Sequence, residues 1–175
     1  MTRLSARADR RLIRPNAHSH RFVLVEVTAP PASRLRERAP VNLAFVLDRS
    51  GSMSGGKLDL AKRAVEEALG RLDPRDRFSI VTYDDVVEMV VGSTPASPEA
   101  RRNAVARLAE VEARGSTDLG EGWLRGCEQV ASHLTGAGVD RVLLRTDGLA
   151  NVGITDPTML AHHASELRAR GVSTT

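Results

Sequence analysis

The sequence predicts an α/β fold: a doubly wound, mostly parallel sheet flanked by helices, with one antiparallel edge strand and an extra N-terminal strand. Two short apolar runs, residues 41–47 and 141–146, are continuous rather than alternating, which is typical of strands buried in a parallel sheet. From residue 41 onward, strand patterns alternate with helix patterns, as they do in α/β proteins. A chain of 175 residues is long enough for one such domain and too short for two large ones.

The charge distribution separates a basic N-terminal extension from the main domain. Residues 1–40 hold nine Arg and three acidic residues, a net charge of +6. Residues 41–175 hold sixteen basic and nineteen acidic residues, a net charge of −3. The arginines of the extension are not interleaved with aromatic residues that would stack on bases, and Arg supplies 23 of the 25 basic residues of the whole chain. We therefore expect a solvated extension and no nucleic-acid partner.

One strand is expected within the extension, over residues 20–28. Apolar and polar residues alternate there, with Val23, Val25 and Val27 on one face, which predicts a half-exposed strand. Pro30 and Pro31 end this strand. We expect irregular backbone over residues 1–20 and an arginine-rich linker over residues 33–40.

The first elements of the main domain follow from periodicity. A helix is expected from near Lys57 to the turn at Asp73-Pro74. Residues 77–83 form the next strand. After a turn at Asp84-Asp85, residues 86–91 form its antiparallel partner at the edge of the sheet.

The later elements are marked mainly by their first residues. Ser97-Pro98-Glu99 is a helix start, with a capping serine and proline in the first turn. A further helix follows Thr117 and runs to about residue 134, and a last one opens at Asp156-Pro157 and ends at Gly171. Residues 172–175 look like the start of another buried strand. Because that strand would leave an unpaired edge, we expect a fragment of a longer protein, incomplete at its C-terminus.

Composition limits the cellular compartments in which the chain is expected. No apolar stretch approaches the roughly 18–20 residues that span a bilayer, and the N-terminus has no apolar signal-peptide core. The single cysteine, Cys127, excludes an internal disulfide and fits a reducing compartment. We expect a cytoplasmic protein without a membrane span.

Five polar residues on three separated loops form a candidate divalent-metal site. Asp48, Ser50 and Ser52 directly follow the first buried strand, Thr117 lies in a glycine-rich turn, and Asp147 follows the second buried strand. Loops at the carboxyl ends of parallel strands converge on a common crevice. Three hydroxyls and two carboxylates meeting there suit a hard cation such as Mg²⁺, which takes oxygen ligands.

The Asp-x-Ser-x-Ser pattern also indicates what such a site would do. Serine hydroxyls are neutral, so direct ligation by Ser50 and Ser52 leaves a cation strongly electrophilic. Carboxylates held one water away balance its charge. An open coordination position would accept a carboxylate from a partner protein.

Three enzyme interpretations compete for the same loop. Residues 51–57 fit a phosphate-binding G-x-x-x-x-G-K loop, but Leu58 stands where Ser or Thr would ligate Mg²⁺. A haloacid-dehalogenase-like phosphotransferase would need a second carboxylate at the position of Ser50. A G-x-S-x-G nucleophile elbow is absent from the sequence. We therefore expect no catalysis by this domain.

Simpler structural roles compete for several other polar residues. Asp48 or Ser50 alone could cap a helix or a turn, and Asp118 is expected to be an N-cap. His162 and His163 are helix neighbours that point apart, so they are expected at the surface, while Cys127 falls on an apolar face. Arg49 and Arg145 flank the site and either steer an acidic partner or are solvated.

Residues 41–175 resemble a von Willebrand factor type A domain, through LAFVLDRSGSMSGGKL, the Gly115–Thr117 turn and TDGLANVG. The sequence of these segments is most similar to bacterial members of the family, which also carry a strand similar to HRFVLVEVTAP before the domain. The resemblance implies a Rossmann-like fold of six strands, whose last strand and helix are absent here. It also implies a metal-ion-dependent adhesion site, in which Ser50, Ser52 and Thr117 ligate Mg²⁺ or Mn²⁺ directly and Asp48 and Asp147 do so through water. No acidic pair follows Ser52, so no second metal is expected there.

The sequence thus predicts divalent-metal-dependent binding of a partner protein through its Asp or Glu. The alternative is a non-catalytic structural or assembly module of a larger complex, in which the metal site is vestigial or merely stabilising. The sequence leaves open the partner, the oligomeric state and the choice among Mg²⁺, Mn²⁺ and Ca²⁺.

Overall fold

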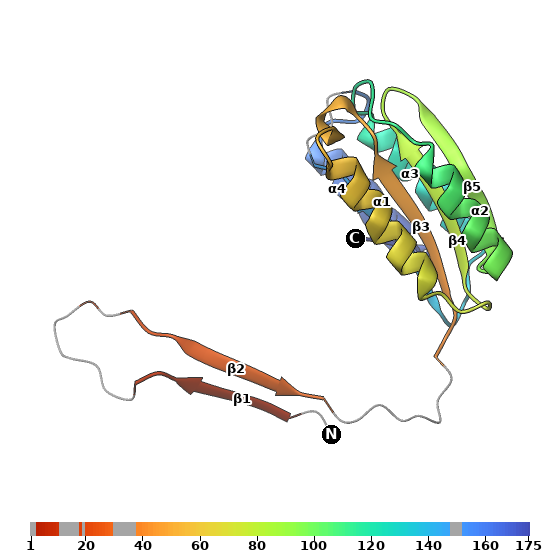
Figure 1. Cartoon of the computed structure of the whole chain (residues 1–175). Helices are drawn as coiled ribbons and strands as arrows, with labels where there is room; N and C mark the ends of the chain where they lie inside the picture. Colours follow the sequence, from red (N-terminus) through yellow and green to blue (C-terminus); the bar gives the residue numbers. More distant parts are fainter. Residues whose placement is uncertain (1–2, 11–17, 19, 30–37, 148–151) are drawn as a thin grey trace. The chain divides into compact units, whose positions relative to one another are not determined.

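The structure is a computed structural model that describes residues 3–10, 18, 20–29, 38–147 and 152–175. The chain divides into two compact units, residues 1–38 and residues 39–175 (Figure 1).

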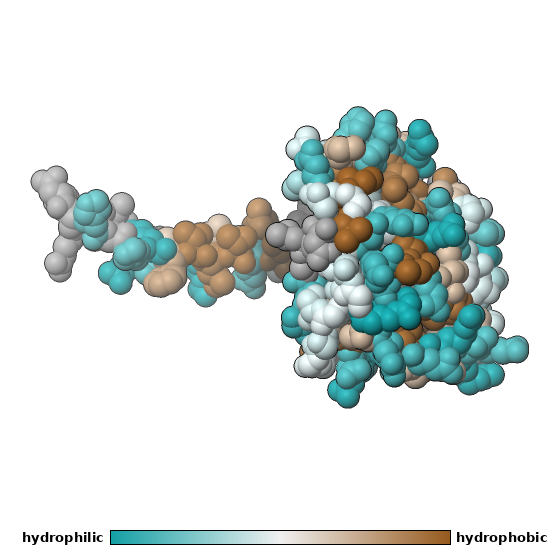
Figure 2. All heavy atoms as spheres, turned by 90° about the horizontal axis from the view of Figure 1, so that it is seen from above, coloured by the Kyte–Doolittle hydropathy of each residue, from teal (hydrophilic) through white to brown (hydrophobic). Residues whose placement is uncertain are grey.

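The N-terminal unit contains a two-stranded antiparallel hairpin. β1 (Arg3–Ala8) pairs with β2 (Val23–Thr28), so the expectation of irregular backbone over residues 1–20 is wrong for β1. The valines of β2 are exposed like the rest of both strands, so the strand is not half-buried as expected. Figure 2 shows hydrophobic residues at the surface of this hairpin. Residues 33–37, which make up most of the expected linker over residues 33–40, lie outside the described residues.

The main unit is built on one mixed sheet. Its described strands lie in the order β5-β4-β3-β6-β7. The neighbouring pairs are parallel except for β4 and β5, which are antiparallel with β5 at the edge, as predicted. The strands are β3 (Val41–Asp48), β4 (Arg77–Tyr83), β5 (Val87–Pro95), β6 (Val139–Arg145) and β7 (Ser173–Thr174).

Helices cover both faces of this sheet, which confirms the predicted α/β class (Figure 1). Alternate residues of β3 enter opposite cores: Phe45 packs with α1 (Lys57–Gly70) and α2 (Pro98–Ala109). Val46 packs on the other face, with α3 (Leu119–Ala131) and α4 (Pro157–Ala169). The two cores together hold β3 at the centre of the sheet.

α2, α3 and α4 begin where the sequence predicts, because side chains cap their free backbone amides. Ser97 accepts from the Ala100 amide, Asp118 from the Glu121 amide and Asp156 from the Thr158 amide, at 2.8–3.1 Å. α3 ends at Ala131, earlier than predicted, and Leu134, near the predicted end of the helix, is exposed.

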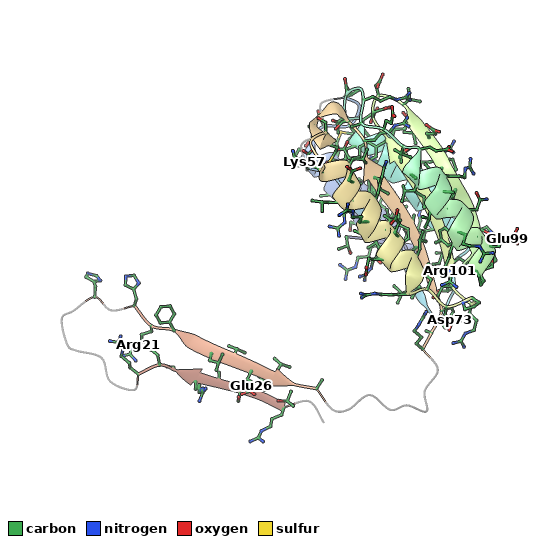
Figure 3. All side chains as sticks on the ribbon, in the orientation of Figure 1. Arg21, Glu26, Lys57, Asp73, Glu99 and Arg101 are labelled. Atoms are coloured by element: carbon green, nitrogen blue, oxygen red, sulfur yellow. The ribbon has the colours of Figure 1, made fainter. Side chains whose placement is uncertain are left out.

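The two ends of α1 lie at opposite ends of the sheet. Figure 3 shows Lys57 at the first turn of α1 and Arg101, from α2, near the other end. Arg101 Nη1 donates to the carbonyl oxygens of Leu69 and Leu72, which closes the C-terminal end of α1. Lys57 thus lies at the end where β3 finishes and the candidate site begins. Within the described part of the chain, no helix is long and apolar enough to cross a bilayer.

Candidate metal centre

The candidate site lies on loops that follow neighbouring strands. β3 ends at Asp48, and a short 3₁₀ turn, Gly51–Met53, carries Ser52 directly after it. β6 runs parallel beside β3 and ends at Arg145, two residues before Asp147. The first and third predicted loops therefore leave the same edge of the sheet side by side.

Hydrogen bonds connect three of the five predicted residues in a row. Ser50 Oγ lies 3.1 Å from Ser52 Oγ, and Ser52 Oγ donates to Asp147 Oδ1 at 2.8 Å. Ser50 and Ser52 come from the first loop and Asp147 from the third, 95 residues beyond Ser52. The structure thus brings two hydroxyls and one carboxylate from separate loops together.

Asp48 is fully buried beneath this row. Its Oδ1 accepts from the backbone amide of Ser50 at 2.8 Å, and its Oδ2 accepts from Thr146 Oγ1 at 2.8 Å. One carboxylate therefore fixes both the first loop and the end of β6. Sequence analysis missed Thr146, although its hydroxyl is adjacent to Asp147 in the chain.

Thr117 is buried in the loop before α3, and this loop lies against the first one. The Gly51 amide donates to the Gly115 carbonyl at 3.1 Å, which joins the two loops through their backbones. Gly115 has φ +68°, and a Cβ there would lie 2.1 Å from Asp85 Oδ1, so this turn requires glycine.

Lys57 is a site neighbour that sequence analysis did not identify. Its Nζ donates to the Ser52 carbonyl at 3.0 Å and pairs with Asp147 Oδ2. The hydrogen bonds from Lys57 and Ser52 hold the pKa of the Asp147 carboxyl below its usual range. Lys57 is recognisable in the sequence as the last residue of the G-x-x-x-x-G-K pattern of residues 51–57. That pattern, however, indicates phosphate binding and not a contact with Asp147.

A cluster of charged side chains, built around the buried Arg49 and Asp84, adjoins the first loop. Arg49 is 5% exposed, so the expectation of a solvated side chain is wrong for this residue. Its Nε donates to Asp84 Oδ2 at 2.9 Å, and its Nη1 pairs with Glu88 Oε2 at 2.7 Å. Arg114 Nε also donates to Asp84 Oδ2, at 2.8 Å. The Asp84-Asp85 segment therefore does more than form a turn.

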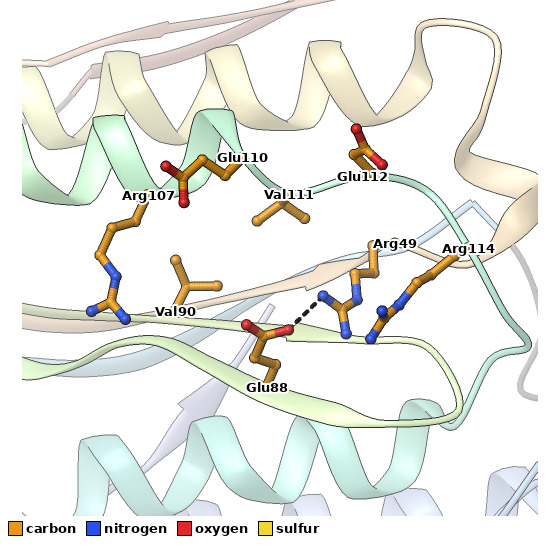
Figure 4. Close-up of a pocket in the computed structure, with 8 residues that line it drawn as sticks. All are labelled: Arg49, Glu88, Val90, Arg107, Glu110, Val111, Glu112 and Arg114. Carbon is orange, nitrogen blue, oxygen red and sulfur yellow. Dashed lines mark hydrogen bonds and ion pairs between the residues drawn. The ribbon is translucent and has the colours of Figure 1, made fainter.

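This cluster borders a pocket of about 310 Å³ beside the first loop. Figure 4 shows Arg49 and Arg114 at one end of the pocket, with Glu88 facing them. Val90 and Val111, both buried, line its apolar part. Arg107, Glu110 and Glu112 complete a lining in which three positive charges balance three negative ones.

The remaining sequence expectations concern residues outside the candidate site. Cys127 is buried in the core, as predicted, and burial raises the pKa of its thiol to about 11. His162 lies at the surface of α4 with Glu166 Oε1 3.8 Å from its Nε2, and His163 has Glu166 Oε2 4.0 Å from its Nδ1. Tyr83 is buried beside the site, where burial and the charge of Asp48 raise the pKa of its phenol.

The chemistry of the donors fits a hard divalent cation. The residues present hydroxyl and carboxylate oxygens, which Mg²⁺, Mn²⁺ and Ca²⁺ prefer. Over the described ranges, no group of three or more His, Cys, Asp or Glu residues is placed to hold a metal. A metal centre in this part of the chain therefore depends on hydroxyl ligands as well as on Asp48 and Asp147.

Matches to related sequences cover most of this chain but only a small part of each relative. The uncharacterized protein YfbK of Escherichia coli K12 is 32% identical over 161 residues, which are 91% of this chain and 28% of YfbK. Human inter-alpha-trypsin inhibitor heavy chain H4 is 31% identical over 133 residues, 73% of this chain and 14% of that protein. The chain thus spans less than a third of either relative.

Solved structures share the fold. A von Willebrand factor type A structure from Catenulispora acidiphila has a TM-score of 0.62 at 20% identity, over 99% of this chain and 39% of that one. Proximal thread matrix protein 1 from the mussel byssus, solved with a zinc-occupied MIDAS motif, has a TM-score of 0.61 at 24% identity, over 79% of this chain and 35% of that one.

The family model of the von Willebrand factor type A domain matches residues 42–174, which include all five candidate ligands. This chain therefore belongs to the von Willebrand factor type A family.

Proposed function

We propose that the chain is a divalent-metal-dependent protein-binding module that takes an Asp or Glu side chain of a partner. Its metal would be held by Asp48, Ser50, Ser52, Thr117 and Asp147. The strongest support is the hydrogen-bonded row from Ser50 Oγ through Ser52 Oγ to Asp147 Oδ1. This row brings oxygen ligands from two loops together. A related protein, the mussel thread matrix protein, carries zinc in its MIDAS motif.

Different residues of the chain would have different roles in such a site. A bound Mg²⁺, Mn²⁺ or Ca²⁺ would supply a Lewis-acidic position for the partner's carboxylate. The neutral hydroxyls of Ser50 and Ser52 leave the charge of a cation largely unneutralised, so a further anion is attracted. The carboxylate of Asp48 accepts hydrogen bonds from the Ser50 amide and from the Thr146 hydroxyl, and so holds the first loop beside the end of β6.

A binding role without catalysis agrees with the partners of the site hydroxyls. Ser50 pairs with Ser52, and Ser52 donates to Asp147, so no histidine takes part in these hydrogen bonds among the described residues. An activated serine nucleophile requires an adjacent general base, usually an imidazole. These partners support a role of the hydroxyls as ligands rather than as nucleophiles.

The alternative is a structural module in which the same residues only stabilise the fold. The pairing of Lys57 with Asp147 and Ser52 supports this alternative, because an ammonium group of the chain itself neutralises Asp147. The two functions differ in whether partner binding requires metal.

A peptide array tests the proposal. Each Asp- or Glu-containing peptide is paired with its Asn or Gln counterpart and probed with the protein in Mg²⁺ and in EDTA. We expect wild-type protein to bind carboxylate peptides in Mg²⁺ alone, Ser52→Ala to lose this binding, and Ser54→Ala to keep it. Ser54 is the matched control, since it lies in the same loop and its hydroxyl donates to the Gly51 carbonyl instead. Binding that survives EDTA or the Asn and Gln exchange would favour the structural alternative.

A further inference from the structure

We propose that Asp84 is a positioning residue for the metal centre: through Arg49 and Arg114 it holds the Ser50–Ser52 loop against the Gly115–Thr117 loop. This inference rests on the proposed metal centre and assigns a function to a residue outside its ligands. Asp84 follows β4 directly, between the two loops, and its side chain is fully buried.

The carboxylate of Asp84 is bound from three segments. Oδ2 accepts from Arg49 Nε at 2.9 Å and from Arg114 Nε at 2.8 Å. Oδ1 accepts from the Val86 amide at 2.7 Å, which fixes the β4–β5 turn. Arg49 stands between two of the proposed ligands, Asp48 and Ser50. One oxygen atom therefore links the first ligand loop to the residue that precedes Gly115.

The backbones of the same residues repeat this connection. The Arg114 amide donates to the Arg49 carbonyl at 2.7 Å, and the Asp118 amide donates to the Asp84 carbonyl at 2.7 Å. Asp118 follows Thr117 and caps α3, so Asp84 holds the second ligand loop at both of its ends. Gly115 packs directly on this junction, because a Cβ there would lie 3.1 Å from Asp84 Cβ.

The arrangement is electrostatically specific. Burial alone would raise the pKa of Asp84, but hydrogen bonds from Arg114, the Val86 amide and Arg49 hold it below its usual range. Charge-assisted hydrogen bonds depend on geometry, so each arginine must keep its position to remain bonded to the buried carboxylate. Asp85, its neighbour in the chain, is exposed and makes a matched control.

The test measures Mn²⁺ affinity by calorimetry in wild-type protein, Asp84→Asn and Asp85→Asn. In Asp84→Asn an amide group replaces one of the acceptor oxygens and the charge is lost. Because the hydrogen bonds from the two arginines lose their charged acceptor, we expect the Mn²⁺ Kd to rise by about tenfold or more. Asp85→Asn removes the same charge one residue away and is expected to keep the wild-type Kd within about twofold.

A second variant separates positioning from folding. Arg114 has a side chain that is 60% exposed, so Arg114→Gln breaks one arm of the junction at little cost to the core. Its Mn²⁺ Kd is expected to rise as well. In the double variant with Asp84→Asn, the two effects are expected to be less than additive, because both remove the same connection. A general loss of stability would not produce this coupling in metal affinity.

The possible outcomes distinguish this inference from the proposed function. Wild-type protein that is folded and binds no Mn²⁺ would overturn the metal centre and the inference together. Wild-type binding with an unchanged Kd in Asp84→Asn would overturn the positioning role alone. If Asp84→Asn does not fold, an unchanged Kd in Arg114→Gln has the same consequence.

Discussion

Lys57 places a positive charge at the edge of the candidate metal centre. Its Nζ contacts the Ser52 carbonyl and the Asp147 carboxylate, so a cation bound by Asp147 would lie near an ammonium group. We predict that Lys57→Gln tightens Mg²⁺ binding by about fivefold, since like unit charges about 4 Å apart repel by about 1 kcal/mol even in water. Calorimetry measures this change. Lys62→Gln, on the same helix but bound to the Ala109 carbonyl, is the control, and unchanged or weaker binding in Lys57→Gln would contradict the prediction.

The same ion pair predicts a pH dependence. Hydrogen bonds from Lys57 and Ser52 lower the pKa of Asp147 in the folded chain. The carboxylate therefore stabilises the fold above its unfolded pKa of about 3.9, and this contribution is lost as the pH falls through the lower folded-state pKa. We expect the Asp147 pKa, followed by ¹³C NMR of its carboxyl carbon, to rise in Lys57→Gln. An identical titration in both proteins would show that the pair does not form in solution.

At the scale of residues, sequence analysis found the candidate ligands but not their supports. Asp48, Ser50 and Ser52 are recognisable because they are adjacent in the chain and follow a buried strand. Arg49 pairs with Asp84, 35 residues away, and Thr146 donates to Asp48 across 98 residues. No local pattern marks a pairing at such separations, so these contacts required the folded chain.

At the scale of elements, α3 packs on β4 through a glycine. A Cβ at Gly122 would lie 2.5 Å from Tyr83 Cγ, and Tyr83 is fully buried. We predict that Gly122→Ala lowers the free energy of unfolding by about 1–3 kcal/mol through overpacking, although alanine favours helix formation. Denaturant unfolding measures the effect.

Gly70→Ala provides the matched comparison. Gly70 is the last residue of α1, and a Cβ there would meet nothing within 4 Å. Alanine is therefore expected to stabilise the chain there by about 0.5 kcal/mol. Equal effects of the two substitutions would show that α3 does not press on Tyr83 as the structure places it.

The starts of α2, α3 and α4 were predictable because each carries a capping residue at a fixed position. Ser97, Asp118 and Asp156 each accept a backbone amide of their own helix. The end of α3 was harder to predict, since the apolar pattern continues to Leu134 after the helix has stopped at Ala131. Gly136, with φ +69°, lies in the connection that follows.

At the scale of the whole molecule, the hairpin and the main domain differ in how far sequence determines them. The alternation in residues 20–28 predicted β2, but β1 contains arginine, serine and alanine and has no strong strand pattern of its own. Its place follows only from pairing with β2. On the paired ribbon, one face carries only apolar residues, and such a two-stranded hairpin is at best marginally stable alone. These residues are Leu4, Ala6, Ala8, Val23, Val25 and Val27.

The main domain, in contrast, places its candidate site through its topology. β3 lies between β4 and β6 in a parallel arrangement, so the segments that follow these three strands leave the sheet at one edge. The alternation of strands and helices was enough to predict this convergence. The family match over residues 42–174 agrees with it.

Calorimetric titration of Mg²⁺ and Mn²⁺ into the purified chain tests the central claim most directly, with Asp48→Asn and Asp59→Asn as variants. Asp48 is buried at the site, whereas Asp59 is exposed in the first turn of α1. We predict one saturable site in wild-type protein and in Asp59→Asn, and its loss in Asp48→Asn. With a Kd near 1 mM, 10 mM Mg²⁺ would also raise the free energy of unfolding by about 1.4 kcal/mol. Folded wild-type protein that binds neither ion, or Asp48→Asn that binds as wild type does, would contradict the metal centre.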